Sequence, residues 1–384
     1  MKINYYNLLL LSIGIVFLIS SCKKKETTPT YSDPDTSLDI HWSSTFESAK
    51  SVNGPVYAIA VNGSDVFVGG TFTMAGTITT SFISKWDTLQ KKWFSLSSGV
   101  NDGSNVKAIA VDGQYVYIGG AFSKIGGVTA TNIARWDTVS KTFSTLGTGV
   151  NGPVSSIAVN GGIIYVGGSF VTAGGITVNN VAKYDTTTTN WTSLGGGING
   201  SVSSLAFRGN GLYVGGYFIT AGDVAANNVG RWYGNSWTGL GNASANGVTG
   251  GTVMGVTTNG TEVYVGGNFS NAGGKPADLV AQWTGSGWAS MPSSGDGLGG
   301  DGFSSCVNAI TMYGTSVYVG GSIVAAGNVK TNNIAKWDGG WFVLGSGASD
   351  GAVRALSSNG TDLWVGGDFK TMGGKQSCYI AHWK

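Results

Sequence analysis

Residues 154–168 read Val-Ser-Ser-Ile-Ala-Val-Asn-Gly-Gly-Ile-Ile-Tyr-Val-Gly-Gly, and this stretch decides the fold. Two runs rich in apolar and β-branched residues flank Asn160-Gly161. Asn-Gly is the strongest short signal for a β-hairpin, because both central residues of a type I′ turn need a positive φ. The second run ends in the pair Gly167-Gly168. The stretch therefore predicts two antiparallel strands joined by a tight turn.

The glycine pair that ends this hairpin recurs through the chain. Successive pairs lie 50, 48, 48, 51, 54 and 46 residues apart, at 69–70, 119–120, 167–168, 215–216, 266–267, 320–321 and 366–367. A period near 50 belongs to the blades of β-propellers, whereas helical solenoids mostly have shorter repeats. The seven copies predict an all-β fold, a seven-bladed β-propeller.

Each copy predicts a blade of four strands. In the third copy the hairpin is followed by a connection over 169–178, a third strand over 180–185 and a fourth over 191–194. The strands are mixed apolar runs rather than strict alternations, as expected for sheets that are covered on both faces.

The seventh copy lacks a fourth strand. The chain stops at Trp383-Lys384 after the third strand, whereas residues 41–46, His-Trp-Ser-Ser-Thr-Phe, stand alone before the first copy. A strand from the opposite terminus would hide the exposed edge of the last sheet. We expect residues 41–46 to complete the closing blade beside residues 379–383.

The start of the chain has the pattern of an export signal. Lys2 precedes an apolar run over 8–19, which is shorter than the ~20 residues that a helix needs to cross a bilayer. Residues 18–22, Leu-Ile-Ser-Ser-Cys, resemble the lipobox of bacterial lipoproteins, in which the cysteine becomes the diacylated N-terminus. An ordinary signal peptide with a chance cysteine is the alternative.

The lipobox resemblance implies three segments. We expect a signal peptide over 1–21, the lipidated Cys22 with a flexible tether over 22–37, and the propeller over 38–384. The tether is polar and has no apolar periodicity, which is typical of a disordered segment. The protein would then be held by its lipid in the outer membrane, facing either the cell surface or the periplasm.

Composition argues against several classes of partner and chemistry. The net charge is +2, charged residues make up 11% of the chain, and no basic stripe could neutralise nucleic-acid phosphates. No known catalytic or cofactor motif occurs, so we predict no catalytic residue, metal or cofactor. His41 and His382 are the two histidines. A two-histidine metal site is conceivable, but we expect both to pack beside tryptophans. Residues 296–302 weakly resemble a calcium loop without its full ligand set.

The repeat resembles the kelch repeat of galactose-oxidase-like propellers. That pattern has a β run ending in two glycines, an aromatic residue on the third strand and a tryptophan on the fourth. Here the pairs are Trp86 with Trp93, Tyr184 with Trp191, Trp232 with Trp237, Trp283 with Trp288 and Trp337 with Trp341. Trp-Asp also recurs, as in WD40 propellers, but that family has a period nearer 40–45 and a Gly-His element. The aromatic residues at these positions are expected in the core rather than in a glycan-binding strip.

The kelch resemblance also implies which residues face a central pocket. The residue after each glycine pair is expected there, on the face of the long connections. These residues are Thr71, Ala121, Ser169, Tyr217, Asn268, Ser322 and Asp368. They differ from one another, and Tyr217, Asn268 and Asp368 offer a ring, an amide and a carboxylate to a ligand or partner. The alternative is a set of solvated rim residues.

Cys306 and Cys378 are the remaining cysteines. Both map to strand starts on one face of adjacent blades, and an exported protein meets oxidising conditions. A Cys306–Cys378 disulfide and two free thiols are both compatible with the sequence.

The sequence favours a non-enzymatic binding or scaffold propeller on the bacterial envelope, with a protein partner or a glycan on the long-connection face. An enzyme that acts on polysaccharides and a structural subunit of an outer-membrane transport or secretion complex are the alternatives. The fold alone does not choose among them.

Overall fold

The computed structural model describes residues 31–47, 50–242, 245–291, 298–299 and 305–384, all within the unit Tyr31–Lys384. The predicted signal peptide, Cys22 and most of the predicted tether lie outside these residues. The candidate calcium loop also lies outside them, apart from Leu298 and Gly299.

Antiparallel sheets of the same order repeat seven times. In each sheet the first two strands of a copy form a hairpin and the third strand follows outward, and the first six sheets also have a fourth strand. In order from the innermost strand, the first three blades are β1 (Val56–Asn62), β2 (Asp65–Gly70), β5 (Ile83–Asp87) and β6 (Lys92–Ser95); β7 (Val100–Asp112), β8 (Tyr115–Ile125), β10 (Ile133–Asp137) and β11 (Thr142–Thr145); and β12 (Val154–Asn160), β13 (Ile163–Gly168), β16 (Val181–Asp185) and β17 (Asn190–Ser193).

The remaining blades keep this order. They are β18 (Ser201–Arg208), β19 (Gly211–Tyr217), β22 (Val229–Tyr233) and β23 (Ser236–Gly239); β25 (Val253–Thr258), β26 (Val263–Gly267), β29 (Val280–Trp283) and β30 (Trp288–Ser290); β32 (Cys306–Tyr313), β33 (Ser316–Ser322), β36 (Ile334–Trp337) and β37 (Trp341–Val343); and β38 (Val353–Ser358), β39 (Leu363–Gly367) and β42 (Ile380–Trp383).

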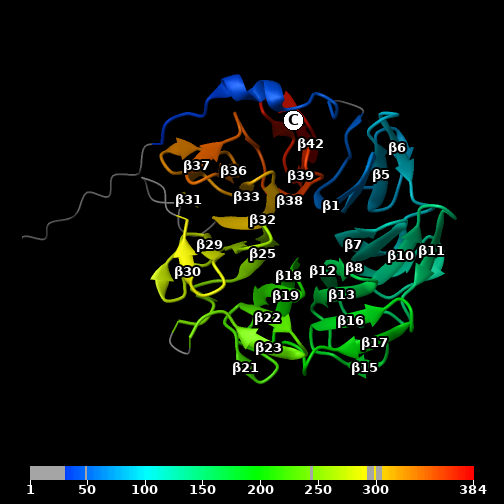
Figure 1. The fold of residues 1–384 in the computed structure, drawn as a ribbon. Helices are drawn as coiled ribbons and strands as arrows, with labels where there is room; N and C mark the ends of the chain where they lie inside the picture. The colour runs from blue at the N-terminus through cyan, green and yellow to red at the C-terminus, as the bar shows by residue number, and fades with distance from the viewer. Residues whose placement is uncertain (1–30, 48–49, 243–244, 292–297, 300–304) are drawn as a thin grey trace, which may run out of the picture. The chain divides into compact units, whose positions relative to one another are not determined.

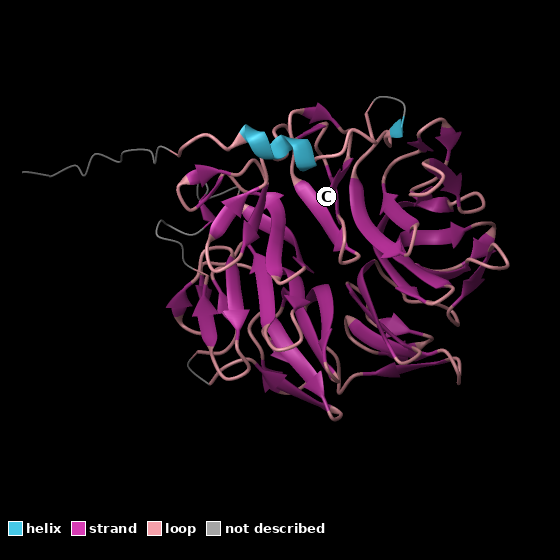
Figure 2. Cartoon of the chain, turned by 45° about the horizontal axis from the view of Figure 1, so that its top comes forward, coloured by secondary structure: helices cyan, strands magenta, loops and turns pink. Residues whose placement is uncertain are grey.

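The blades form a closed ring. Each innermost strand contacts the innermost strand of the next blade, and β38 contacts β1. Figure 1 shows these strands around a common centre, with the colour running once around the ring from blue to red. Figure 2 shows that strands and loops make up almost all of the described chain. The predicted seven-bladed β-propeller is confirmed.

The glycine pairs sit where adjacent sheets touch. A Cβ on Gly215, the first glycine of its pair, would overlap Val253 on the innermost strand of the next blade. The same relation joins Gly366 to Val56 and so closes the ring. A Cβ on a second glycine, such as Gly70, would overlap the backbone of Pro55. Each pair is therefore fixed by close approach of a neighbouring sheet and a neighbouring strand.

The fourth-strand tryptophans tie their blades to the preceding blade or segment, whereas the second blade has Phe143 at this position. Trp191 is buried and donates its Nε1 hydrogen to the carbonyl of Leu146, at 2.9 Å, and Trp237 does the same to Leu194, at 2.7 Å. Gly174, in the connection of the same blade, packs directly on the Trp191 ring. These tryptophans are core residues, as the sequence predicts.

The N-terminal segment completes the last blade in the same way. Trp42 pairs with Trp383, and the Ser43 amide donates to the carbonyl of His382 at 2.9 Å. Trp42 is 1% exposed, donates to the Leu344 carbonyl at 2.9 Å and lies under Gly373. Trp42 thus occupies the position that Trp191 has in the third blade. The predicted closure is confirmed over residues 41–43, after which the chain turns.

Part of the range predicted as a tether contacts the sixth blade in the structure. Ser32 pairs with Val329 on β35, Asp33 lies 2.6 Å from the Lys330 ammonium, and a 3-10 helix spans Thr36–His41. The compact unit Tyr31–Lys384 thus includes residues 31–37 of the range predicted as a tether. The backbone groups of this segment find partners on a strand edge, which composition does not reveal.

The long connections contain small hairpins that the sequence analysis left as loops. In the third blade Ala173-Gly174-Gly175-Ile176 is a tight turn, and both glycines have positive φ. The short strands are β3 (Met74–Ala75), β4 (Ile78–Thr79), β9 (Val128–Thr129), β14 (Thr172–Ala173), β15 (Ile176–Thr177), β20 (Thr220–Ala221), β21 (Val224–Ala225), β24 (Val248–Thr249), β27 (Asn271–Ala272), β28 (Lys275–Pro276), β31 (Leu298–Gly299), β34 (Ala325–Ala326), β35 (Val329–Lys330), β40 (Thr371–Met372) and β41 (Lys375–Gln376).

Cys306 and Cys378 are free thiols in the structure, so the disulfide alternative is not formed. The Cys306 thiol donates to Asn308 on its own strand, at 3.2 Å. The Cys378 carbonyl accepts a hydrogen bond from Ser51, which precedes the first blade. The two residues therefore make their contacts with different parts of the ring, although both lie at strand starts.

Candidate ligand-binding site at the propeller axis

Each innermost strand carries a β-bulge on the long-connection face, near the start of the strand or, in the longer β7, near its middle. Val56 pairs with Gly70 and Ala58 with Gly69, so Tyr57 between them has no partner of its own. The same shift occurs in the other six blades. A bulge redirects the side chain of its extra residue, and bulges are common beside functional sites. The seven bulged residues are Tyr57, Lys107, Ser155, Ser203, Met254, Asn308 and Arg354.

All seven bulged residues line a cavity on the axis. Its inner part has a volume of about 200 Å³ and is bordered by the innermost strands of all seven blades. A wider part of about 510 Å³, here called the mouth, is lined by Tyr57, Thr71, Asn105, Lys107, Ser155, Asn308 and Arg354. A volume of this size falls within the range of small-molecule sites.

An ion pair holds one of the two cations of the mouth. Arg354 Nε and Nη2 lie 2.8 and 2.7 Å from Asp368 Oδ2, and both side chains are partly exposed. Asp368 therefore orients Arg354. Among the described residues Lys107 has no ion-pair partner, and its side chain is exposed.

The polar groups of the mouth differ in how far they are already paired. Asn308 Nδ2 donates to the Val353 carbonyl at 3.0 Å, and Asn308 Oδ1 accepts from Cys306, so this amide is fixed in place. Asn105 Nδ2 donates to Ser104 at 3.0 Å, but its buried Oδ1 has no hydrogen-bond partner. An unpaired buried acceptor has a cost, which a donor on a bound ligand would remove.

Serines below the mouth join the blades. Ser156 Oγ accepts a hydrogen bond from the Leu205 amide at 3.0 Å, and Ser204 Oγ accepts one from the Val256 amide at 2.9 Å. Hydrogen bonds of this kind, from a backbone amide to a serine hydroxyl, hold neighbouring innermost strands at fixed spacing. The bulged side chains above them are therefore carried on a rigid frame, as binding residues commonly are.

The structure brings two of the residues predicted after the glycine pairs to the mouth. Thr71 lines the mouth, and Asp368 forms an ion pair with Arg354 beside the mouth. The side-chain Oδ1 of Asn268 accepts a hydrogen bond from the Thr252 amide at 2.7 Å, and Tyr217 is 68% exposed. The described lining of the mouth does not include the other five residues predicted there, which are Ala121, Ser169, Tyr217, Asn268 and Ser322.

The bulged residues are the part of the site that the sequence analysis missed. A signal for them is present in the repeat. The innermost strand of every copy contains Val, a variable residue, a small residue and then Ile, Leu or Val. The variable residue is Tyr, Lys, Ser, Ser, Met, Asn and Arg in turn. Such variation between two near-constant neighbours indicates a residue that does not pack in the core.

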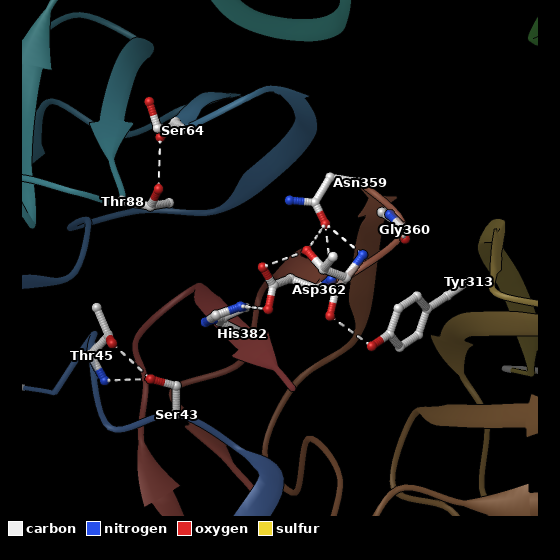
Figure 3. A network of polar contacts seen from close by, with 11 residues as sticks. Ser43, Thr45, Ser64, Thr88, Tyr313, Asn359, Gly360, Asp362 and His382 are labelled. Carbon is white, nitrogen blue, oxygen red and sulfur yellow. Dashed lines mark hydrogen bonds and ion pairs between the residues drawn. The ribbon is translucent and has the colours of Figure 1, made fainter.

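The two histidines lie away from the mouth and beside tryptophans, as predicted. His382 stacks on Trp364, with ring centroids 4.3 Å apart, and its Nε2 lies 3.0 Å from Asp362 Oδ1 in the turn between β38 and β39 (Figure 3). Burial lowers the pKa of His382, and the Asp362 carboxylate opposes that shift. His41 is 5.2 Å from the Trp383 ring. The described residues contain no cluster of three or more metal-binding side chains.

In the described part of the chain, no helix is both long and apolar enough to cross a membrane.

Known proteins share this architecture. The extracellular domain of the putative one-component system BT4673 from B. thetaiotaomicron matches with a TM-score of 0.54 and 10% sequence identity. The match covers 90% of this chain and 40% of that one, so this chain spans less than half of the solved protein. No protein-family model and no curated protein matches the sequence. At this identity the likeness shows the β-propeller fold, and the fold alone does not give the function.

Proposed function

We propose that this chain is a non-enzymatic binding module that takes its ligand, or a protruding group of a partner, in the mouth of the axial cavity. The observation that carries the proposal is the set of seven bulged residues. They occupy one position in seven similar strands, differ in chemistry and converge on a single cavity. Packing alone would favour similar residues at equivalent positions.

The geometry favours binding over catalysis. Asp368 is the carboxylate beside the mouth, and Arg354 engages it through two nitrogens. Both guanidinium contacts fall on Oδ2 of this carboxylate, so it is engaged by Arg354 rather than placed to contact a reacting group. Its role in the proposal is to position Arg354.

The proposal places the chain among kelch-like propellers on the bacterial envelope. The Trp and glycine pairs of each blade support the first part, and the Leu-Ile-Ser-Ser-Cys stretch at 18–22 supports a lipid anchor at Cys22. The matched solved structure is described as an extracellular domain, which agrees with an exported location. Replacement of Cys22 by Ser should release the protein from the membrane fraction of its host. Retention of the variant there would contradict lipid anchoring.

The test compares two tyrosines on the same face. Full-length protein is used to capture partners from native membranes and is applied to a glycan array, and binding is then measured by titration. Tyr57→Ala should weaken binding at least tenfold, which corresponds to about 1.4 kcal/mol. Tyr217→Ala, outside the mouth, should leave binding within twofold. If Tyr217→Ala abolishes binding while Tyr57→Ala does not affect it, recognition occurs on the outer rim and the proposal is wrong.

A further inference from the structure

The cations of the mouth are gathered on one side of it. Lys107, Tyr57 and Arg354 come from the second, first and seventh blades, which are consecutive around the ring. The bulged residues across the axis, Ser203 and Met254, are uncharged and line only the inner part of the cavity. One wall of the mouth therefore has the Tyr57 ring in its middle, with Lys107 on one side of the ring and Arg354 on the other.

We propose that the ligand is an acidic saccharide whose anionic group binds between Lys107 and Arg354 while a sugar ring contacts Tyr57. This inference rests on the proposed function and adds the chemical class of the ligand. Hydrogen bonds between a charged donor and a carboxylate are about twice as strong as neutral ones. Arginine also suits a carboxylate geometrically, because its donors form a planar fork.

Asp368 prepares Arg354 for this role. Both of its contacts use the Nε and Nη2 edge of the guanidinium, which leaves the Nη1 edge directed elsewhere. A long side chain held in one orientation loses less entropy when a ligand binds. Since Asp368 balances one of the two positive charges, Lys107 supplies the net charge of the wall.

The uncharged lining favours a saccharide over an acidic peptide. Thr71 and Ser155 present hydroxyl groups, and Asn105 and Asn308 present amides. The unpaired Asn105 Oδ1 is an acceptor that a sugar hydroxyl can satisfy. No aliphatic side chain occurs among the described lining residues of the mouth, so an apolar peptide side chain would find little to contact there.

The experiment uses titration calorimetry on the full-length protein with matched probes. The probes are a galacturonic acid trisaccharide, its methyl ester, a sulfated galactose trisaccharide and a short polyglutamate peptide. The ester keeps the sugar rings but removes the charge, and the sulfated probe tests whether any anion serves as well as a carboxylate. The variants are Lys107→Gln, Arg354→Gln and Tyr57→Ala. Lys124→Gln, an exposed lysine of the second blade outside the lining, is the control.

The acid should bind at least tenfold more tightly than its ester, and Lys107→Gln or Arg354→Gln should remove that preference without weakening the ester. Lys124→Gln should change neither. The affinity for the acid should also fall as salt rises from 50 to 500 mM, because screening weakens exposed charge pairs. If the sulfated probe binds more tightly than the acid, the ligand is still an anionic saccharide, but its anionic group is a sulfate rather than a carboxylate.

Three results would overturn the inference. They are equal affinity for acid and ester, preference for the polyglutamate peptide, and the absence of binding by every acidic saccharide. If acid and ester bind equally but Tyr57→Ala weakens both, only the inference about charge fails and the binding mouth stands. If Tyr57→Ala weakens neither, the proposed function fails as well.

Discussion

Replacing Trp42 by Ala tests how the ring is closed. Trp42 is 1% exposed, its ring meets Trp383 edge-on at a centroid distance of 4.8 Å, and its Nε1 hydrogen is donated to Leu344. Large-to-small changes of a buried tryptophan cost about 3–5 kcal/mol. The Leu344 carbonyl also loses its donor, so we take about 4 kcal/mol as the expected loss. Unfolding entropy of ~2.1 cal/mol/K per residue over ~350 residues converts this to a fall in Tm of about 5 °C.

The assay is thermal unfolding followed by near-ultraviolet circular dichroism, with hydrogen exchange at the β42 amides. Trp42→Phe keeps an aromatic ring without the N–H group, and it should cost less than Trp42→Ala. Trp191→Ala in the third blade removes the equivalent interblade bond and should have a similar effect on Tm. In Trp42→Ala, exchange should rise first at β42. A variant that melts within 1 °C of the wild type, with β42 still protected, would refute the closure argument.

Three further predictions concern packing, pH and the thiols. Gly215→Ala should lower the free energy of unfolding by about 1–3 kcal/mol, because its Cβ would overlap Val253, whereas Gly287→Ala, with open space around it, should be nearly neutral; equal denaturation midpoints for the two variants would contradict this packing. Because burial lowers the pKa of His382 below its ordinary 6.5, His382 contributes stability that is present above about pH 6.5 and is lost as the pH falls through the lower folded-state pKa. Between pH 7.5 and 4.5, the free energy of unfolding measured in urea should therefore fall less for His382→Gln than for the wild type or His41→Gln. The same pH dependence in all three proteins would contradict this role of His382. Both Cys306 and Cys378 should be alkylated in denaturant without reductant, as two free thiols require; protection of the pair until reductant is added would show that the disulfide forms.

The blade architecture could be predicted because its causes are local or repeat with a fixed period. Asn160-Gly161 fixes a turn by its own backbone preferences, and the glycine pairs recur wherever a neighbouring sheet approaches. The closing strand could also be predicted, since the seventh copy is incomplete and Trp42 matches the missing residue. In each case one sequence pattern reports one physical requirement.

The site was only partly predictable because it depends on a bulge. The residues Val56-Tyr57-Ala58 alone do not indicate that Tyr57 is unpaired in the sheet. Regular strand alternation would place its side chain on a face of the sheet. The kelch resemblance pointed instead to the residues after the glycine pairs, of which Thr71 and Asp368 reach the mouth region. The ion pair joins Arg354 in β38 to Asp368, which directly follows β39, and their side-chain directions follow from the fold rather than from spacing.

The most direct test of the account is hydrogen exchange of the full-length protein with and without a saturating ligand from the titrations above. The account predicts new protection at amides beside the bulges of the innermost strands, around Lys107 in β7 and Arg354 in β38. The outer strands β6, β11 and β17 should exchange at unchanged rates. Protection confined to those outer strands or to the hairpin turns, with none near the axis, would contradict binding in the axial mouth.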